Sequence, residues 1–152
     1  MAIQLHEVTK DNWAAVCRLP LKAGQEHYVA PNWHSLLLIA YEGWGTARAI
    51  YDDETLVGFV LYGSAPDDPR WWVVRFMIAA DHQRRGYGRT ALPLIIQEMR
   101  ERHATPAIHI SFVPENEPAR TLYASLGFVD TGTIEDGEAV YVLNFDTPMK
   151  DS

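Results

Sequence analysis

Hydrophobic residues recur along the first half of the chain with two different periods. From Ile3 to Val8, apolar and polar residues alternate, as in a strand with one buried face. From Trp33 to Ala40, the apolar residues instead recur at the spacing of one helix face. Two β-rich runs then flank the acidic turn Asp52-Asp53-Glu54, as in a hairpin. These patterns predict a strand over 3–8, helices over 13–19 and 32–41, and hairpin strands over 46–51 and 55–62.

The second half opens on a long apolar run from Trp71 to Ala80, which only Arg75 interrupts and which predicts a buried strand. A basic turn follows, and then a helix over 87–103. The apolar face of that helix is formed by Leu92, Ile95, Ile96 and Met99. Pro93 has no backbone N–H to donate, so we expect a kink or a loosened first turn there. The remaining pattern predicts strands over 107–113, 128–131 and 139–145, and a helix that starts at Asn116 and ends at Gly127.

The order of these elements is β-α-α-β-β-β-α-β-α-β-β. Such an order predicts an α/β (mixed α+β) fold in which helices cover the faces of a mixed sheet. The chain has 152 residues, with no repeat and no linker-like stretch, so we expect residues 1–152 to form a single domain.

Composition and charge exclude several classes of function. Net charge is −7, which disfavours binding to nucleic acid and mildly favours a cationic substrate. No apolar run approaches the roughly 18 residues of a membrane span, and the N-terminus lacks the features of a secretory signal. Cys17 is the only cysteine, which fits a reducing cytoplasm. The histidines show no metal-ligand spacing, so we expect no metal, no membrane partner and a cytoplasmic protein.

The turn between the predicted strand and the helix at 87 is suited to phosphate. The first N–H groups of a helix have no partner within the helix and carry partial positive charge. Gly86 and Gly88 let the backbone approach an anion closely, and Arg84, Arg85 and Arg89 add positive charge. Two common phosphate motifs, G-x-x-x-x-G-K-[ST] and G-x-G-x-x-G, are absent, and a lone G-x-G is often only a loop.

Residues 83–88, Gln-Arg-Arg-Gly-Tyr-Gly, instead fit the pattern Q/R-x-x-G-x-G/A. Between a strand and a helix, this resembles the acyl-CoA pyrophosphate loop of the GNAT superfamily of N-acetyltransferases. Residues 116–128 resemble a second segment of that family, N-x-x-A-x-x-L-Y-x-x-x-G-F. Two motifs in the family's order are more specific than either alone. The resemblance implies a twisted, mostly antiparallel mixed sheet of about six or seven strands, flanked by about four helices.

The resemblance also implies an enzyme that transfers acetyl from acetyl-CoA to a primary amine, with Tyr123 as the acid that protonates the departing sulfur. A phenol with a pKa of about 10 remains protonated at neutral pH and can donate to a thiolate. Asn116 is expected as a helix cap and as a cofactor ligand, and Arg120 either reaches a phosphate or is a solvated charge. No residue stands out as the general base. The cofactor would be bound by Phe76, Met77, Ile78, Gln83, Arg84, Arg85, Gly86, Tyr87, Gly88, Arg89, Asn116 and Arg120.

Within the superfamily, residues 28–35, 51–63 and 111–116 look like the bacterial diamine and spermine/spermidine acetyltransferases. A polyamine needs carboxylates and aromatic faces around its binding groove. The candidates near the two N-terminal helices are Glu26, Tyr28, Glu42 and Asp52, each of which can also be read as a solvated surface residue. Another small amine, a drug or a protein N-terminus remains an alternative acceptor, as does a non-catalytic acyl-CoA sensor. The resemblance also leaves a homodimer open.

Overall fold

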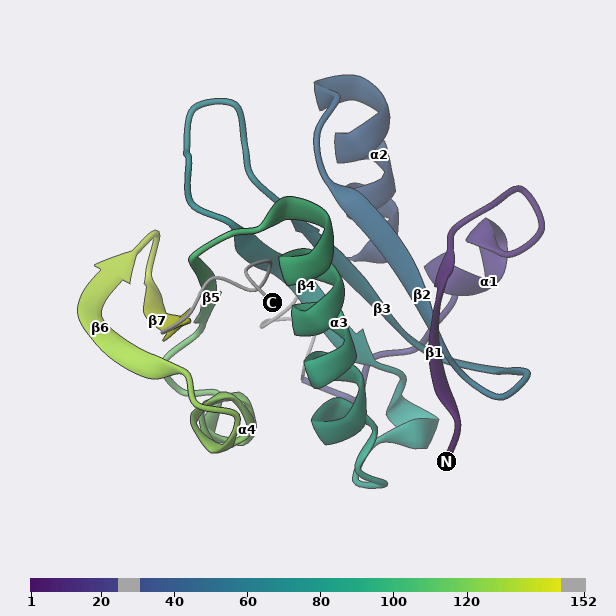
Figure 1. Ribbon diagram of the computed structural model, residues 1–152. Helices are drawn as coiled ribbons and strands as arrows, with labels where there is room; N and C mark the ends of the chain where they lie inside the picture. The colour runs from purple at the N-terminus through teal and green to yellow at the C-terminus, as the bar shows by residue number, and fades with distance from the viewer. Residues whose placement is uncertain (25–30, 146–152) are drawn as a thin grey trace.

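The computed structural model describes residues 1–24 and 31–145 of the chain. Within these residues seven strands form one sheet in the order β1-β2-β3-β4-β5-β7-β6 (Figure 1). All neighbouring strands are antiparallel except β4 and β5, which are parallel. The strands are β1 (Ile3–Glu7), β2 (Thr46–Asp52), β3 (Thr55–Gly63), β4 (Trp72–Ile78), β5 (Ala107–Phe112), β6 (Val129–Glu135) and β7 (Glu138–Asn144). The predicted mixed, mostly antiparallel sheet is confirmed.

Four α-helices cover the two faces of this sheet, and a short 3₁₀ turn, Ala80–His82, follows β4. The helices are α1 (Trp13–Cys17), α2 (Asn32–Glu42), α3 (Tyr87–His103) and α4 (Glu117–Ser125). In Figure 1, α3 crosses in front of the sheet, while α1 and α2 lie behind it. Buried side chains of α3 and Tyr123 of α4 belong to one core, and Val16 of α1 with Leu36 and Ile39 of α2 belong to a second. The sheet therefore separates two apolar layers.

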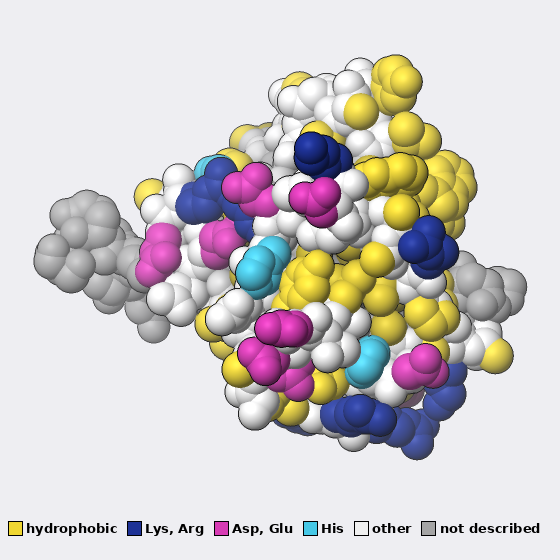
Figure 2. Space-filling model, turned by 90° about the vertical axis from the view of Figure 1, so that its right-hand side faces the viewer, with side chains coloured by type: hydrophobic (Ala, Val, Ile, Leu, Met, Phe, Trp, Pro, Cys, Tyr) yellow, Lys and Arg dark blue, Asp and Glu magenta, His cyan; other side chains and the backbone are white. Residues whose placement is uncertain are grey.

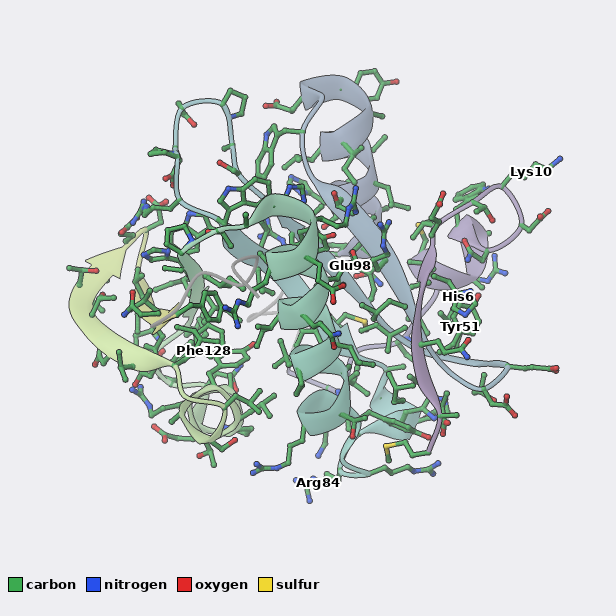
Figure 3. All side chains as sticks on the ribbon, in the orientation of Figure 1. His6, Lys10, Tyr51, Arg84, Glu98 and Phe128 are labelled. Atoms are coloured by element: carbon green, nitrogen blue, oxygen red, sulfur yellow. The ribbon has the colours of Figure 1, made fainter. Side chains whose placement is uncertain are left out.

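A polar contact ties α3 to the sheet between these apolar residues. The side chain of Glu98 turns from α3 toward β2 and β3 (Figure 3). Arg48 of β2 donates from Nε to Glu98 Oε2 at 3.1 Å, and the hydroxyl of Tyr62 on β3 donates to the same carboxylate. Burial, followed by this carboxylate, raises the pKa of Tyr62 to about 12. The partly buried carboxylate of Glu98 is thus both paired with a cation and hydrogen-bonded, which offsets the cost of removing its charge from water.

The contact between β4 and β5 is short. Their pairing is limited to Trp72 with His109 and Val73 with Ile110. Beyond these pairs β4 continues along β3 and β5 along β7, so the two strands diverge. The register of β3 and β4 also shifts by one residue, which leaves Val74 without a partner on β3, as in a β-bulge. This divergence places an open strand edge at the centre of the sheet.

Most element boundaries lie within two residues of the sequence prediction, and α3 has the predicted bounds. The helix is continuous through Pro93, which is exposed on its outer side. Strand β6 extends four residues beyond the predicted 128–131. Its pairing with β7 is interrupted between Asp130 and Ile134, where Gly132 has φ +82°, and resumes at Ile134. None of the helices in residues 1–24 and 31–145 combines the length and apolar character needed to cross a bilayer.

Candidate functional site

A cleft of about 330 Å³ opens where the edge of β4 meets α3 and α4. Its wall combines backbone from the end of β4, the turn before α3, and side chains of α4. The lining residues are Leu21, Lys22, Phe76, Met77, Ile78, His82, Gln83, Arg84, Gly86, Tyr87, Gly88, Asn116, Pro118, Ala119, Leu122 and Tyr123. Nine of the predicted cofactor residues and Tyr123 therefore lie around one cavity, although the two motifs are about 30 residues apart in sequence.

The turn before α3 is held in a left-handed conformation. Gly86 has φ +83° and Arg84 has φ +65°, which is strained for a residue with a side chain. The side chain of Gln83 donates from Nε2 to the carbonyl of Ile78 at 2.8 Å, which fixes the turn against the end of β4. This geometry leaves the first N–H groups of α3 at the cleft, where a helix N-terminus favours an anion.

Gly88 allows α3 and α4 to approach closely at the cleft. A Cβ atom at this position would lie 3.1 Å from Cδ2 of Leu122 and 3.9 Å from Cε2 of Phe76. Any side chain here would therefore intrude on the wall made by β4 and α4. The second glycine of the motif is required for close packing, and not for an unusual backbone angle.

Positive charge lies at the outer end of the cleft. Figure 3 places Arg84 at the lower end of the molecule, below α3, and Figure 2 shows Lys and Arg side chains gathered at that end. Arg84 also lines a neighbouring surface hollow of about 500 Å³, together with Arg89. Arg89 donates to the hydroxyl of Ser125 at 2.9 Å. Arg85 lines neither the cleft nor this hollow. The cleft therefore passes from an apolar inner part to a basic outer part.

Tyr123 lies at the inner end of the cleft and is 7% exposed. Its ring packs between Phe112, with ring centroids 5.5 Å apart, and Phe128, at 6.0 Å. Burial raises the pKa of Tyr123, and the negative charge of Glu138 raises it further. The phenol therefore holds its proton at neutral pH, as a proton donor to a leaving group must.

Asn116 and Arg120 have well-defined roles in the structure. Asn116 caps α4, since its Oδ1 accepts from the backbone N–H of Ala119 at 3.3 Å, and it also lines the cleft. Arg120 does not line the cleft. Its guanidinium donates to the hydroxyl of Tyr141 at 3.0 Å and to the carbonyl of Pro114 at 2.6 Å. Held in this way, Arg120 joins α4 to β7.

The predicted acceptor residues are not brought together in the described part of the chain. Asp52 accepts from the hydroxyl of Tyr87 at 2.6 Å and from the N–H of Ala2 at 2.8 Å, which lowers its pKa. It therefore fixes the start of α3 to β2 from outside the cleft. Glu42 is exposed at the end of α2 and does not line the cleft. Glu26 and Tyr28 lie outside the described residues.

The predicted site residues leave out six residues of the wall. Pro118, Ala119 and Leu122 lie within the second motif, whereas Leu21, Lys22 and His82 lie outside both motifs. Leu21 and Lys22 follow α1 in a stretch without a regular pattern, and they reach the cleft because the N–H of Ala80 donates to the carbonyl of Pro20 at 2.7 Å. His82 is part of the 3₁₀ turn, and its buried Nδ1 has no hydrogen-bond partner within the described residues. No local signal in the sequence could have placed Leu21 and Lys22 at the site, whereas His82 directly precedes the first motif.

Comparison with known proteins agrees with this geometry. The model of the family described as "Acetyltransferase (GNAT) family" matches residues 11–128, which include both motifs. The chain belongs to the acetyltransferase (GNAT) family. This acetyltransferase is also 30% identical, over 149 residues, to the spermine/spermidine N(1)-acetyltransferase of Bacillus subtilis strain 168. The alignment covers 93% of this chain and 98% of that protein.

Solved structures show the same fold at low sequence identity. The PaiA N-acetyltransferase of Thermoplasma acidophilum, crystallised with coenzyme A, is 12% identical with a TM-score of 0.70, and 95% of this acetyltransferase and 100% of that chain are covered. An acetyltransferase of Salmonella typhimurium that modifies the N-terminal serine of ribosomal protein L7/L12 is also 12% identical, with a TM-score of 0.77 and 96% of each chain covered. These likenesses support the fold.

The residues of the cleft are suited to coenzyme A. Its inner wall is largely apolar, with Phe76, Met77 and Leu122, and can pack against a thin aliphatic chain. Its outer end has the helix N-terminus and Arg84, which suit a pyrophosphate. His82 also lines the cleft, and its buried Nδ1 has no hydrogen-bond partner among the described residues.

Proposed function

We propose that this acetyltransferase transfers acetyl from acetyl-CoA to a primary amine of a polyamine, such as spermidine, spermine or a diamine. The main observation in support of this reaction is that the basic turn before α3 and Tyr123 line the same cleft. The polyamine is supported by the relative from Bacillus subtilis, whose printed name is spermine/spermidine N(1)-acetyltransferase and which aligns along almost its whole length.

Acetyl-CoA would supply an acetyl group already activated as a thioester. The backbone of Phe76, Met77 and Ile78 offers hydrogen-bonding groups along the open edge of β4. The turn from Gln83 to Arg89 binds the pyrophosphate through its N–H groups, with Arg84 adding charge, and Asn116 contributes from the start of α4. These contacts orient the thioester toward Tyr123, at the inner end.

Tyr123 holds a proton that it donates from Oη when the thiolate departs. Because burial raises its pKa, the phenol is the form present over the whole neutral range. General acids of this kind contribute roughly 10²- to 10⁴-fold to a rate. Replacement by phenylalanine removes the proton and keeps the ring that packs against Phe112 and Phe128.

The test is thiol release from acetyl-CoA with spermidine, spermine and putrescine, beside a panel of amino acids, an aminoglycoside and a peptide with a free N-terminal serine. We expect the polyamines to give the highest kcat/KM. In Tyr123→Phe, kcat should fall roughly 100-fold or more while the Kd for CoA is unchanged. Tyr41→Phe is the control, because Tyr41 is 84% exposed on α2.

Turnover of another amine alone would replace the polyamine proposal. Tight binding of CoA without turnover of any amine would favour the acyl-CoA sensor. Full activity in Tyr123→Phe would show that another group protonates the sulfur.

A further inference from the structure

The cleft does not end at the face of the sheet on which α3 and α4 lie. Phe76 and Ile78 belong to the core under α3, whereas Met77 belongs to the core under α1 and α2, and all three line the cleft. Leu21 and Lys22, which follow α1, line it as well. Because β4 and β5 diverge after Val73 and Ile110, the cavity passes the open edge of β4 toward the second face.

A polar pair lies on that second face of the sheet, beside the divergence. Ile110 and Phe112 of β5 point into the core under α3, so Ser111 between them faces the other way. Ser111 pairs with Val140 of β7, and Glu138, two residues earlier, shares its face. The hydroxyl of Ser111 donates to Oε1 of Glu138 at 2.8 Å, which fixes the direction of this carboxylate.

Glu138 differs from the other acidic residues near this end of the sheet. Asp68 and Glu135 are both neutralised by Arg70, at 3.0 and 2.8 Å. Within residues 1–24 and 31–145, Glu138 forms no ion pair, and Ser111 is its hydrogen-bond donor. Its charge is therefore not neutralised by an ion pair within these residues, unlike the charges of Asp68 and Glu135.

Two neighbouring groups sense this charge. Burial raises the pKa of Tyr123, and the charge of Glu138 raises it further. Burial lowers the pKa of Arg75 on β4, and Glu138 opposes that shift. Arg75 donates from Nη1 to the carbonyl of Val74 at 2.9 Å, while its buried Nε has no partner among the described residues. Glu138 is thus electrostatically coupled to both sides of the divergence, to the acid on α4 and to β4.

We propose that Glu138, oriented by Ser111, binds the ammonium group of the acceptor amine on the face of the sheet opposite α3 and α4. The amine and the thioester then meet at the open edge of β4 from opposite faces, with Tyr123 beside them. A fixed carboxylate that forms no ion pair within the described residues, although its charge acts on the nearby Arg75, can bind a protonated amine. This inference rests on the proposed function, since it names the acceptor subsite of the same reaction.

The test compares Glu138→Gln with the wild type in steady-state kinetics. Glutamine keeps the size of the side chain and an oxygen that can accept from Ser111, so folding should be preserved. A charge-assisted hydrogen bond is lost, and we expect the KM for spermidine to rise about tenfold or more. The KM for acetyl-CoA and the Kd for CoA should remain within about twofold of wild type. The increase should shrink in high salt, where the wild-type attraction is itself screened.

Two further variants make the comparison specific. Ser111→Ala keeps the charge of Glu138 but removes the hydrogen bond that fixes its carboxylate, so the KM for spermidine should rise by a smaller factor. If Glu138→Gln does not fold, the KM of Ser111→Ala serves as the test. Glu7→Gln makes the same change in net charge on β1, the edge strand farthest from β7, and should leave the KM for spermidine unchanged.

A KM for spermidine within about twofold of wild type in Glu138→Gln would overturn the inference and leave the polyamine proposal intact. Wild-type protein that acetylates only another amine would overturn the polyamine proposal, and the Glu138 comparison would then be made with that amine. Wild-type protein that acetylates no amine would overturn both.

Discussion

Gly58→Ala should disturb the strand that forms the floor of the cleft. Gly58 lies on β3 opposite Ile78 of β4. A Cβ atom added here would lie 2.5 Å from the carbonyl oxygen of Met77 and 2.9 Å from Cδ1 of Ile78. The first contact is with backbone, so a change of side-chain rotamer cannot relieve it. The end of β4, which supplies Met77 and Ile78 to the cleft, has to move instead.

The size of the effect follows from this distance. The carbonyl must retreat to at least 3.0 Å, which displaces β4 by about half an ångström. Overpacking costs about 1–3 kcal/mol, and a weakened ladder hydrogen bond, such as that from Ala79 N to the carbonyl of Val57, adds about 1 kcal/mol. We therefore expect a loss of about 2–4 kcal/mol and, at about 2–4 °C per kcal/mol, a fall in Tm of about 4–16 °C. The KM for acetyl-CoA should rise as well.

The assay is thermal unfolding followed by circular dichroism, with steady-state kinetics below the transition. Gly88→Ala is the matched control, because its Cβ would meet the end of the Leu122 side chain, which can move. In that variant alanine also favours the helix, so the Tm should change little while the KM for acetyl-CoA rises. A Tm for Gly58→Ala within about 2 °C of wild type would refute the reasoning, because it would mean that β4 accommodates the methyl group without cost.

Two further predictions concern hydrogen bonds around the site. Tyr87→Phe removes the donor to Asp52 and loosens the turn before α3. The Kd for CoA, measured by calorimetry, should therefore rise several-fold, while the KM for spermidine is unchanged. An unchanged Kd would show that the turn is held without this contact. The hydrogen bond from Arg70 lowers the pKa of Asp68 in the folded protein to about 2. Between about pH 4 and 2, Asp68 therefore binds a proton more readily in the unfolded state than in the folded state. Stability from this pair should therefore be present above about pH 4 and be lost as the pH falls toward 2. The difference in Tm between wild type and Asp68→Asn should shrink over that range, and a constant difference would contradict the assignment.

Local patterns in the sequence predicted the elements and one side of the cleft. The bounds of α3 followed from its apolar face, and the glycine turn followed from the chemistry of a helix N-terminus. Tyr123 was predicted from its place in the second motif, a short segment that covers α4 and the residues at both of its ends. These signals operate over short stretches of chain, where periodicity and spacing can be read directly.

Other parts of the site depend on contacts between distant segments, which no local pattern records. Lys22 reaches the cleft because Pro20, two residues earlier, accepts a backbone hydrogen bond from Ala80 in the turn after β4. Asp52 looked like a turn residue or a ligand for an amine, and its partner Tyr87 is 35 positions away. Glu138 gave no signal, since its position beside Ser111 is set by the register of β5 and β7.

The two residue pairs between β4 and β5 also divide the sheet into two antiparallel units, β1 to β4 and β5-β7-β6. Beyond those pairs, β4 and β5 are joined by α3, which connects them in sequence, and by any ligand bound in the cleft between the two units. A bound cofactor would contact β4 on one side and α4 on the other. It would therefore hold the two units together as well as react. Binding of the cofactor and the stability of the domain would then be thermodynamically linked.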